Sequence, residues 1–261
     1  MTLKQHLIAL IFGLILVINC IVLSLLTYVV LLFKCLPIKA LQRFCRHINE
    51  KIASLWTGII LFFVKHFFPT QWEINLPNDI TPDDWYLIIC NHQCWLDIVV
   101  LFIIFHKKIP FLKFFIKDQL KWVPFLGLVW IGLEYPLMKR YSKEKIKKHP
   151  HLKGHDIEYT KKRCEIFKDN PTAILNFVEG TRFTEAKKSQ QQSPYRQLLK
   201  PRAGGIAYVL TCMNDQINQV LDVTIAYPDG IKSLWQFLGG TVSQVKVTVR
   251  KENALQHNIT E

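Results

Sequence analysis

A histidine and an aspartate five residues apart are the first candidates for catalysis. His92 follows the apolar run Trp85 to Cys90, which is typical of a buried strand, and Asp97 stands near the start of the apolar run Trp95 to Phe105, which is typical of a helix. On one continuous helix this spacing would place the two side chains about 140° apart around the axis, but here they straddle a turn. The carboxylate can then accept from one imidazole nitrogen and leave the other as a general base.

The pair has no serine beside it, so we expect the nucleophile to be a substrate hydroxyl that His92 deprotonates for attack on an activated ester. Two alternatives stay open: Cys94 as the nucleophile of a thioesterase or hydrolase, and a buried His92 hydrogen-bonded only for structure. The spacing alone does not decide, because His151 and Asp156 repeat it inside a basic stretch with no strand and apolar helix around it.

A second cluster follows the predicted strand Thr172 to Val178 and has the residues of an anion site. Gly180 lets backbone amides approach a phosphate, Thr181 adds a hydroxyl donor, and the guanidinium of Arg182 matches two phosphate oxygens at once. We expect Glu179 to orient Arg182 or the loop amides rather than to act as a general acid. The alternative is an ordinary turn with an exposed ion pair.

The composition restricts the classes of protein and partner. Half of the residues are hydrophobic and 20% are charged, which excludes a disordered chain. The net charge of +13 favours an anionic membrane surface, a phosphorylated substrate or nucleic acid, but no nucleic-acid-reading motif is present. The 7 cysteines form no Cys-x-x-Cys pair, and Cys90, His92 and Cys94 lack a fourth zinc ligand, so we expect reduced thiols and no metal.

The run Leu7 to Phe33 has no charged side chain, and as a helix it would be about 40 Å long, enough to cross a hydrocarbon layer of about 30 Å. It is too long for the apolar part of a signal peptide, so the sequence predicts a membrane helix. Lys4 alone precedes it, whereas five Lys or Arg residues follow it by Lys51, which places the N-terminus outside and the body in the cytoplasm. A second run, Ile52 to Val64, is too short to span and is expected to lie at the membrane interface, or to be a core helix.

Predicted strands and helices alternate after Gln71. The further elements expected are a helix over Ala203 to Met213 and strands over Val220 to Ala226 and Thr241 to Arg250. This order predicts an α/β fold with a mixed sheet flanked by helices, preceded by an N-terminal transmembrane or interfacial segment. The expected division is 1–68 for the membrane-anchoring helices and 69–261 for the catalytic domain.

Four blocks of sequence together resemble the lysophospholipid acyltransferases of the 1-acylglycerol-3-phosphate O-acyltransferase family. They are Asn91 to Asp97, Lys117 to Leu120 with Val123, Pro124 and Gly127, Glu179 to Arg182, and Val223 to Pro228. Trp95, together with Lys200 to Arg202 and Gly205, is most similar to the branch of lysocardiolipin and lysophosphatidylinositol acyltransferases and their bacterial relatives.

The resemblance implies a role for each block. His92 is the base and Asp97 its partner, whereas Lys117 and the Glu179, Gly180, Thr181, Arg182 tetrad hold the phosphate of the acceptor. Pro228 belongs to site architecture and acyl-donor binding. Cys94 departs from the family, where serine or threonine is common at this position, and this change leaves the implied mechanism intact.

The implied activity is transfer of a fatty acyl group from an acyl thioester, acyl-CoA or acyl-ACP, to the free hydroxyl of a lysophospholipid. The first acceptor expected is 1-acylglycerol-3-phosphate, which gives phosphatidate; another lysophospholipid is the alternative. The expected partners are this acceptor, the thioester co-substrate and membrane lipids, with no cofactor and no nucleic acid. We expect the catalytic domain to lie on the cytoplasmic face of a membrane, namely a bacterial inner membrane. The basic stretch Lys139 to Lys153 is expected to contact the phosphates of the donor.

Overall fold

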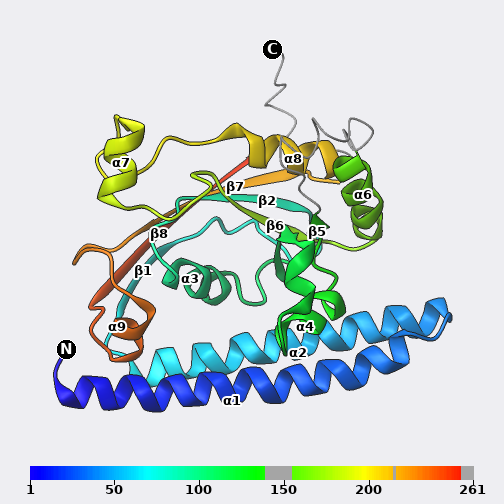
Figure 1. Ribbon diagram of the computed structural model, residues 1–261, viewed down its shortest axis with the longest axis horizontal. Helices are drawn as coiled ribbons and strands as arrows, with labels where there is room; N and C mark the ends of the chain where they lie inside the picture. Colours follow the sequence, from blue (N-terminus) through cyan, green and yellow to red (C-terminus); the bar gives the residue numbers. More distant parts are fainter. Residues whose placement is uncertain (139–154, 214–215, 254–261) are drawn as a thin grey trace.

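The computed structural model describes residues 1–138, 155–213 and 216–253 (Figure 1). The basic stretch Lys139 to Lys153, and with it His151, lies outside the described residues. Of the two residues that open the next helix, His155 and Asp156, only the backbone is described.

A mixed six-stranded sheet forms the centre of the molecule, in the order β1-β8-β7-β2-β6-β3. The neighbours β7, β2, β6 and β3 are parallel, β8 runs antiparallel to β7, and β1 pairs in parallel with β8. The strands are β1 Gln71–Asn75, β2 Tyr86–Cys90, β3 Leu112–Phe114, β6 Ala173–Phe177, β7 Gln219–Ala226 and β8 Gln244–Asn253. The prediction of a mixed sheet flanked by helices is confirmed.

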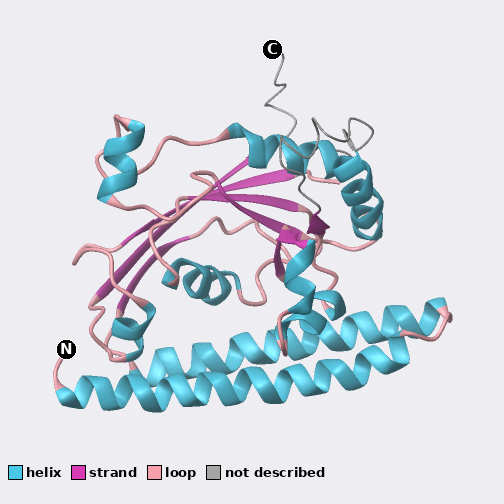
Figure 2. Ribbon diagram, in the orientation of Figure 1, coloured by secondary structure: helices cyan, strands magenta, loops and turns pink. Residues whose placement is uncertain are grey.

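Helices cover both faces of this sheet (Figure 2). One face packs on α3 (Leu96–Phe105), and the other on α6 (His155–Cys164) and α8 (Ala203–Met213). Strand β2 is apolar without interruption because its alternate side chains enter both layers: Ile88 joins the core under α3, and Leu87 joins the core under α8. The central strand, which carries His92 at its carboxyl end, is therefore held from both sides.

Short elements complete the described part of the chain. They are β4 Ile116–Lys117, which pairs with β5 Leu137–Met138, the helices α4 Leu126–Gly132, α7 Glu185–Gln191 and α9 Leu234–Leu238, and the 3-10 turns η1 Asp118–Trp122 and η3 Glu165–Phe167. The sequence did not predict β1, β3, β4 or β5 as strands. Strands β3 to β5 have only two or three residues, and β1 has four exposed residues out of five, so none has a clear apolar pattern.

Two long helices lie side by side along one edge of the molecule (Figure 1). They are α1 (Leu3–Lys34) and α2 (Lys39–Phe67). The prediction of a short helix over Ile52 to Val64 was wrong in its extent, because α2 continues through the preceding basic stretch. Its buried side chains Cys45, Asn49, Ala53 and Thr57 recur every four residues, and this stripe packs inward well before the apolar run begins.

The described residues contain one helix long and apolar enough to cross a membrane, α1. Both of its ends touch the α/β part of the chain, which we call the body. Near the N-terminus, His6 Nδ1 accepts from the indole of Trp235 at 3.1 Å. Near the other end, the hydroxyl of Tyr28 donates to the carbonyl of Phe125 at 2.5 Å.

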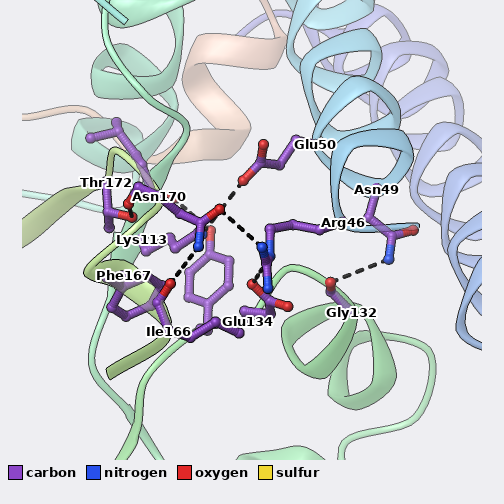
Figure 3. Close-up of polar contacts among 12 residues, drawn as sticks. Arg46, Asn49, Glu50, Lys113, Gly132, Glu134, Ile166, Phe167, Asn170 and Thr172 are labelled. Atoms are coloured by element: carbon purple, nitrogen blue, oxygen red, sulfur yellow. Dashed lines mark hydrogen bonds and ion pairs between the residues drawn. The ribbon is translucent and has the colours of Figure 1, made fainter. Parts of the chain in front are cut away.

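A set of ion pairs, which we call the ion cluster, joins this helical hairpin to the body. Glu134, just after α4, accepts from Lys34 of α1 at 2.6 Å and from Arg46 of α2 at 2.7 Å. Arg46 also donates to Asn170 at 2.9 Å, in the turn that leads into β6 (Figure 3). The hairpin is therefore attached to the loops at the amino end of the sheet.

The same cluster contains an ammonium group enclosed by protein. Lys113 of β3 is buried, and its Nζ lies 3.7 Å from Oε1 of Glu50 on α2 (Figure 3). Burial lowers the pKa of Lys113, and the negative charges of Glu50 and Glu134 offset only part of this effect. Glu134 shows the opposite balance, because burial alone would raise its pKa, whereas Lys34 and Arg46 hold it below its ordinary value.

Candidate active site

His92 and Asp97 meet at the turn between β2 and α3. The Nδ1 of His92 lies 2.9 Å from Oδ2 of Asp97, whose side chain is 0% exposed. The same oxygen accepts from the backbone amides of Gln93 at 2.6 Å and Cys94 at 2.9 Å, so the turn itself places the carboxylate. With Nδ1 bonded to this acceptor, Nε2 is the nitrogen left to exchange a proton with a substrate.

The second oxygen of Asp97 is held from another strand. The hydroxyl of Tyr227, just after β7, donates to Oδ1 of Asp97 at 2.7 Å, and the thiol of Cys94 lies 3.6 Å from the same atom. The sequence did not single out Tyr227 as a site residue. The signal was present, however, because a parallel neighbour of β2 must end at the same edge of the sheet as His92.

The imidazole plane is fixed by stacking. The ring of His92 lies on the ring of Phe177 with centroids 3.8 Å apart and an angle of 13° between the planes. The side chain of the preceding residue, Asn91, pairs with the backbone of β7. Its Nδ2 donates to the carbonyl of Ile225 at 2.9 Å, and its Oδ1 accepts from the backbone amide of Ile225 at 2.8 Å. His92 is thus placed by three neighbouring strands, β2, β6 and β7.

Glu179 lies behind the histidine and is 1% exposed. Its two oxygens accept from the backbone amides of His92 at 3.0 Å and Leu199 at 2.9 Å, and the amide of Phe183 donates to the carbonyl of His92 at 2.8 Å. Of the two roles expected for Glu179, the structure shows the orientation of loop amides, not of Arg182. A carboxylate in this place repels an anion, so we assign it a positioning role and leave phosphate contact to its neighbours. Gly180 has φ 68°, which permits the sharp turn after it.

Arg182 extends from this loop to the start of α3. Its guanidinium carbon lies 4.5 Å from the ring centroid of Trp95, which is 57% exposed and stands at the start of α3. The hydroxyl of Thr181 accepts from Nζ of Lys187 at 2.7 Å, and Lys187 also donates to the carbonyl of Arg182 at 3.0 Å. The sequence did not predict Lys187, which lies in the first turns of the short helix α7, outside the tetrad.

Neither Arg182 nor Lys187 forms an ion pair with a carboxylate among the residues that the structure describes. Two cations are therefore held in place by an aromatic ring, a hydroxyl and a carbonyl, and their charges are available to an anion. A phosphate group is such an anion, and its oxygens accept hydrogen bonds from both side chains.

The structure does not join every predicted residue to this centre. Lys117 is exposed at the start of η1, and no contact among the described residues links it to His92, Asp97 or Arg182. Pro228 is exposed and follows Tyr227 directly, so it lies at the edge of the site without touching the pair through a hydrogen bond.

Cys94 is a poor nucleophile in this geometry. Burial, and then the negative charge of Asp97, raise the pKa of the Cys94 thiol to about 11. The thiol points at a carboxylate oxygen, which disfavours the thiolate that a cysteine hydrolase needs.

Comparison with known proteins identifies relatives of this chain. The family model described as Acyltransferase matches residues 72–228. The chain is 22% identical over 198 residues to lysocardiolipin acyltransferase 1 of Gallus gallus, covering 71% of this chain and 50% of that protein. It is 25% identical over 218 residues to lysophosphatidylinositol acyltransferase 10 of Caenorhabditis elegans, covering 78% and 53%. The chain thus spans about half the length of these curated relatives.

A solved structure has the same fold. The crystal structure of the 1-acyl-sn-glycerophosphate (LPA) acyltransferase PlsC from Thermotoga maritima aligns with a TM-score of 0.60 at 15% identity. The alignment covers 99% of this chain and 88% of that one, so it includes the helical hairpin as well as the sheet.

Proposed function

The chain belongs to the acyltransferase family, whose model matches residues 72–228 of its 261, and from this premise we propose that it acylates a lysophospholipid. The donor is an acyl thioester, acyl-CoA or acyl-ACP, and the first acceptor proposed is 1-acylglycerol-3-phosphate, which becomes phosphatidate. The observation that carries the proposal is the His92–Asp97 contact of 2.9 Å beside a loop with two cations, Arg182 and Lys187, that form no ion pair with a carboxylate in the described part of the chain. The reaction needs no cofactor besides the thioester.

In the proposed reaction Nε2 of His92 removes the proton from the free glycerol hydroxyl of the acceptor. The oxygen attacks the thioester carbonyl, the C–O bond forms, and the tetrahedral intermediate collapses with cleavage of the C–S bond. The imidazolium returns its proton to the leaving thiolate, which departs as the free thiol. Asp97 stabilises the transient imidazolium through Nδ1 and keeps the ring in the required tautomer.

Arg182 and Lys187 hold the acceptor's phosphate in this proposal, with Thr181 as a further donor. The hydroxyl of Thr181 accepts from Lys187 and keeps its own hydrogen for a phosphate oxygen. Binding the phosphate fixes the distance between the glycerol hydroxyl and His92, and such positioning lowers the barrier by removing translational and rotational freedom before the reaction. Lys117 is proposed as a further cation that attracts the acceptor's phosphate from outside this site.

An apolar cavity of about 150 Å³ supports a lipid substrate. It lies between α1, α2, α3 and α4, and Trp56, Ile98 and Phe102 are among its lining residues. Ile98 directly follows Asp97 in the first turn of α3, so the same short helix carries one residue of the pair and part of the cavity wall. It has room for part of an acyl chain.

We place α1 in the plane of the cytoplasmic leaflet rather than across the bilayer, which changes the expectation drawn from its length. The body contacts both ends of α1, so a spanning orientation would carry one end of the body through the hydrocarbon. Large apolar side chains are exposed along the whole helix, at Leu3, Leu7, Leu10, Ile11, Leu14, Val17, Ile18, Val22, Leu25, Leu26, Val29, Leu32 and Phe33. Their spacing of three and four residues makes one continuous face for lipid.

The test is acyl transfer by the purified protein in vesicles, with a panel of lysolipids and both thioester donors. We expect a diacyl product and one free thiol for each ester formed, and loss of both with His92→Ala and Asp97→Asn, while each variant stays bound to the vesicles. Full activity of either variant would overturn the assignment of the base. Release of free fatty acid without an acceptor would instead favour a thioesterase.

A further inference from the structure

Tyr227 is a buried phenol whose role is not explained by the reaction steps above. It follows β7, and its hydroxyl donates to Oδ1 of Asp97 at 2.7 Å, on the side opposite to His92. Burial and the negative charge of Asp97 raise the pKa of Tyr227 far above the ordinary phenol value. The hydroxyl therefore keeps its proton and acts as a donor throughout the acidic and neutral pH range.

Asp97 accepts a full set of hydrogen bonds, and they are divided between its oxygens. Oδ2 takes the imidazole Nδ1–H and the amides of Gln93 and Cys94, all of which belong to its own turn. Oδ1 takes the hydroxyl of Tyr227, with the longer thiol contact of Cys94 at 3.6 Å. Tyr227 is thus the strong donor that reaches the carboxylate from a different strand.

We propose that Tyr227 is a positioning residue for acyl transfer, which orients the carboxylate of Asp97 toward His92 and weakens its hold on the imidazole proton. The first effect follows from geometry, because a carboxylate pinned at Oδ1 cannot rotate away from Nδ1. The second follows from charge, because each donor to a carboxylate spreads its negative charge and makes it a weaker partner for a cation. This inference rests on the proposed function, since it concerns the base of that reaction.

The direction of the pH effect can be derived. A general base works in its neutral form, so kcat/KM falls on the acid side as His92 becomes protonated. With the Tyr227 hydroxyl removed, Asp97 holds the imidazolium more tightly, and the acid limb moves to higher pH. The other titratable groups that face the pair are Cys90, Cys94 and Glu179. The substitution removes a hydrogen bond that lowers the pKa of Cys94, so this pKa rises further and the thiol stays neutral across the acid limb.

The experiment compares Tyr227→Phe with Tyr135→Phe. Tyr135 is a matched control because its buried hydroxyl donates to the carbonyl of Leu112 at 2.9 Å, away from the catalytic pair. For Tyr227→Phe we expect the acid limb of kcat/KM to rise by about 0.5–1 pH unit, with kcat roughly 10-fold lower and the lysolipid KM unchanged. Tyr135→Phe should lower thermal stability by a similar amount and leave the pH profile in place.

A second variant keeps the inference testable if Tyr227→Phe does not fold. Site-specific replacement of Tyr227 by 3-fluorotyrosine preserves the shape and gives a stronger donor, so the acid limb should move to lower pH. If the enzyme is active and the pH profiles of kcat/KM of both variants coincide with that of the wild-type protein, the proposed role of Tyr227 is overturned. Absence of acyl transfer by the wild-type protein would overturn the proposed function itself.

Discussion

The guanidinium of Arg182 lies over the indole of Trp95, with 4.5 Å between the guanidinium carbon and the ring centroid. The two residues come from separate blocks of the sequence, one beside the proposed base and one in the loop after β6. The ring fixes the face of the guanidinium and leaves the N–H groups at its edge free for phosphate oxygens. The stack therefore sets the distance between the proposed phosphate site and His92.

This relationship predicts a change in acceptor binding when the ring is lost. Trp95→Leu should raise the lysolipid KM about 2- to 5-fold, the equivalent of about 0.5–1 kcal/mol for an exposed cation–π contact, with little change in kcat. Trp95→Phe should retain most of the affinity. Steady-state kinetics with varied lysolipid measure both values.

Trp122→Leu is the matched control, because Trp122 also has a cation over its ring, Nζ of Lys121 at 5.6 Å, on η1. An equal rise in KM for Trp122→Leu and Trp95→Leu would show that the effect comes from the lipid surface and not from Arg182.

Lys187 should contribute to acceptor binding although it lies outside the predicted tetrad. We expect Lys187→Ala to raise the lysolipid KM roughly 10-fold, the value of one charge-assisted hydrogen bond of about 1.4 kcal/mol, and to weaken the salt dependence of KM. The adjacent Lys188 is the control, because it pairs with Glu185 on α7 at 3.7 Å. If Lys188→Ala has the same effect as Lys187→Ala, only the general charge of α7 matters.

Cys94→Ser should retain acyl transfer within about threefold, because the hydroxyl can also donate to Asp97 and the mechanism does not use the sulfur.

The native thiol of Cys94 should also resist alkylation at neutral pH. With a pKa of about 11, its thiolate fraction grows only as the pH approaches that value, so alkylation mapped by mass spectrometry should accelerate above about pH 10. Rapid alkylation of Cys94 at pH 7, together with loss of activity in Cys94→Ser, would favour the cysteine hydrolase.

The sequence predicted those parts of the fold and the site that depend on local pattern. The strand before His92 and the helix that begins next to Asp97 were recognised because each is a continuous apolar run, and the turn between them has a spacing that brings the side chains together. Tyr227 and Lys187 were not recognised, because their contacts depend on strand order and on the path of a loop. The ion cluster was hidden for the same reason: its members come from five elements or loops, and each alone looks like a surface charge.

The ion cluster leads to a prediction about stability. Glu134→Gln leaves Lys34 and Arg46 partly buried without their carboxylate, so we expect the free energy of unfolding in detergent to fall by about 3 kcal/mol. Glu185→Gln, at an exposed pair on α7, should cost less than about 0.5 kcal/mol. A chemical or thermal unfolding curve compares the two.

The pH dependence of that stability separates an ion pair from simple packing. The pKa of Glu134 is lower in the folded protein than its ordinary value, so its carboxylate stabilises the fold at neutral pH, and this contribution is lost as the pH falls through the folded pKa. Wild-type stability should therefore decline on acidification more steeply than that of Glu134→Gln, and the two curves should converge at low pH. A constant difference between them down to pH 3 would mean that the side chain acts through its shape and hydrogen bonds, because the charge would then contribute nothing to holding the hairpin on the body.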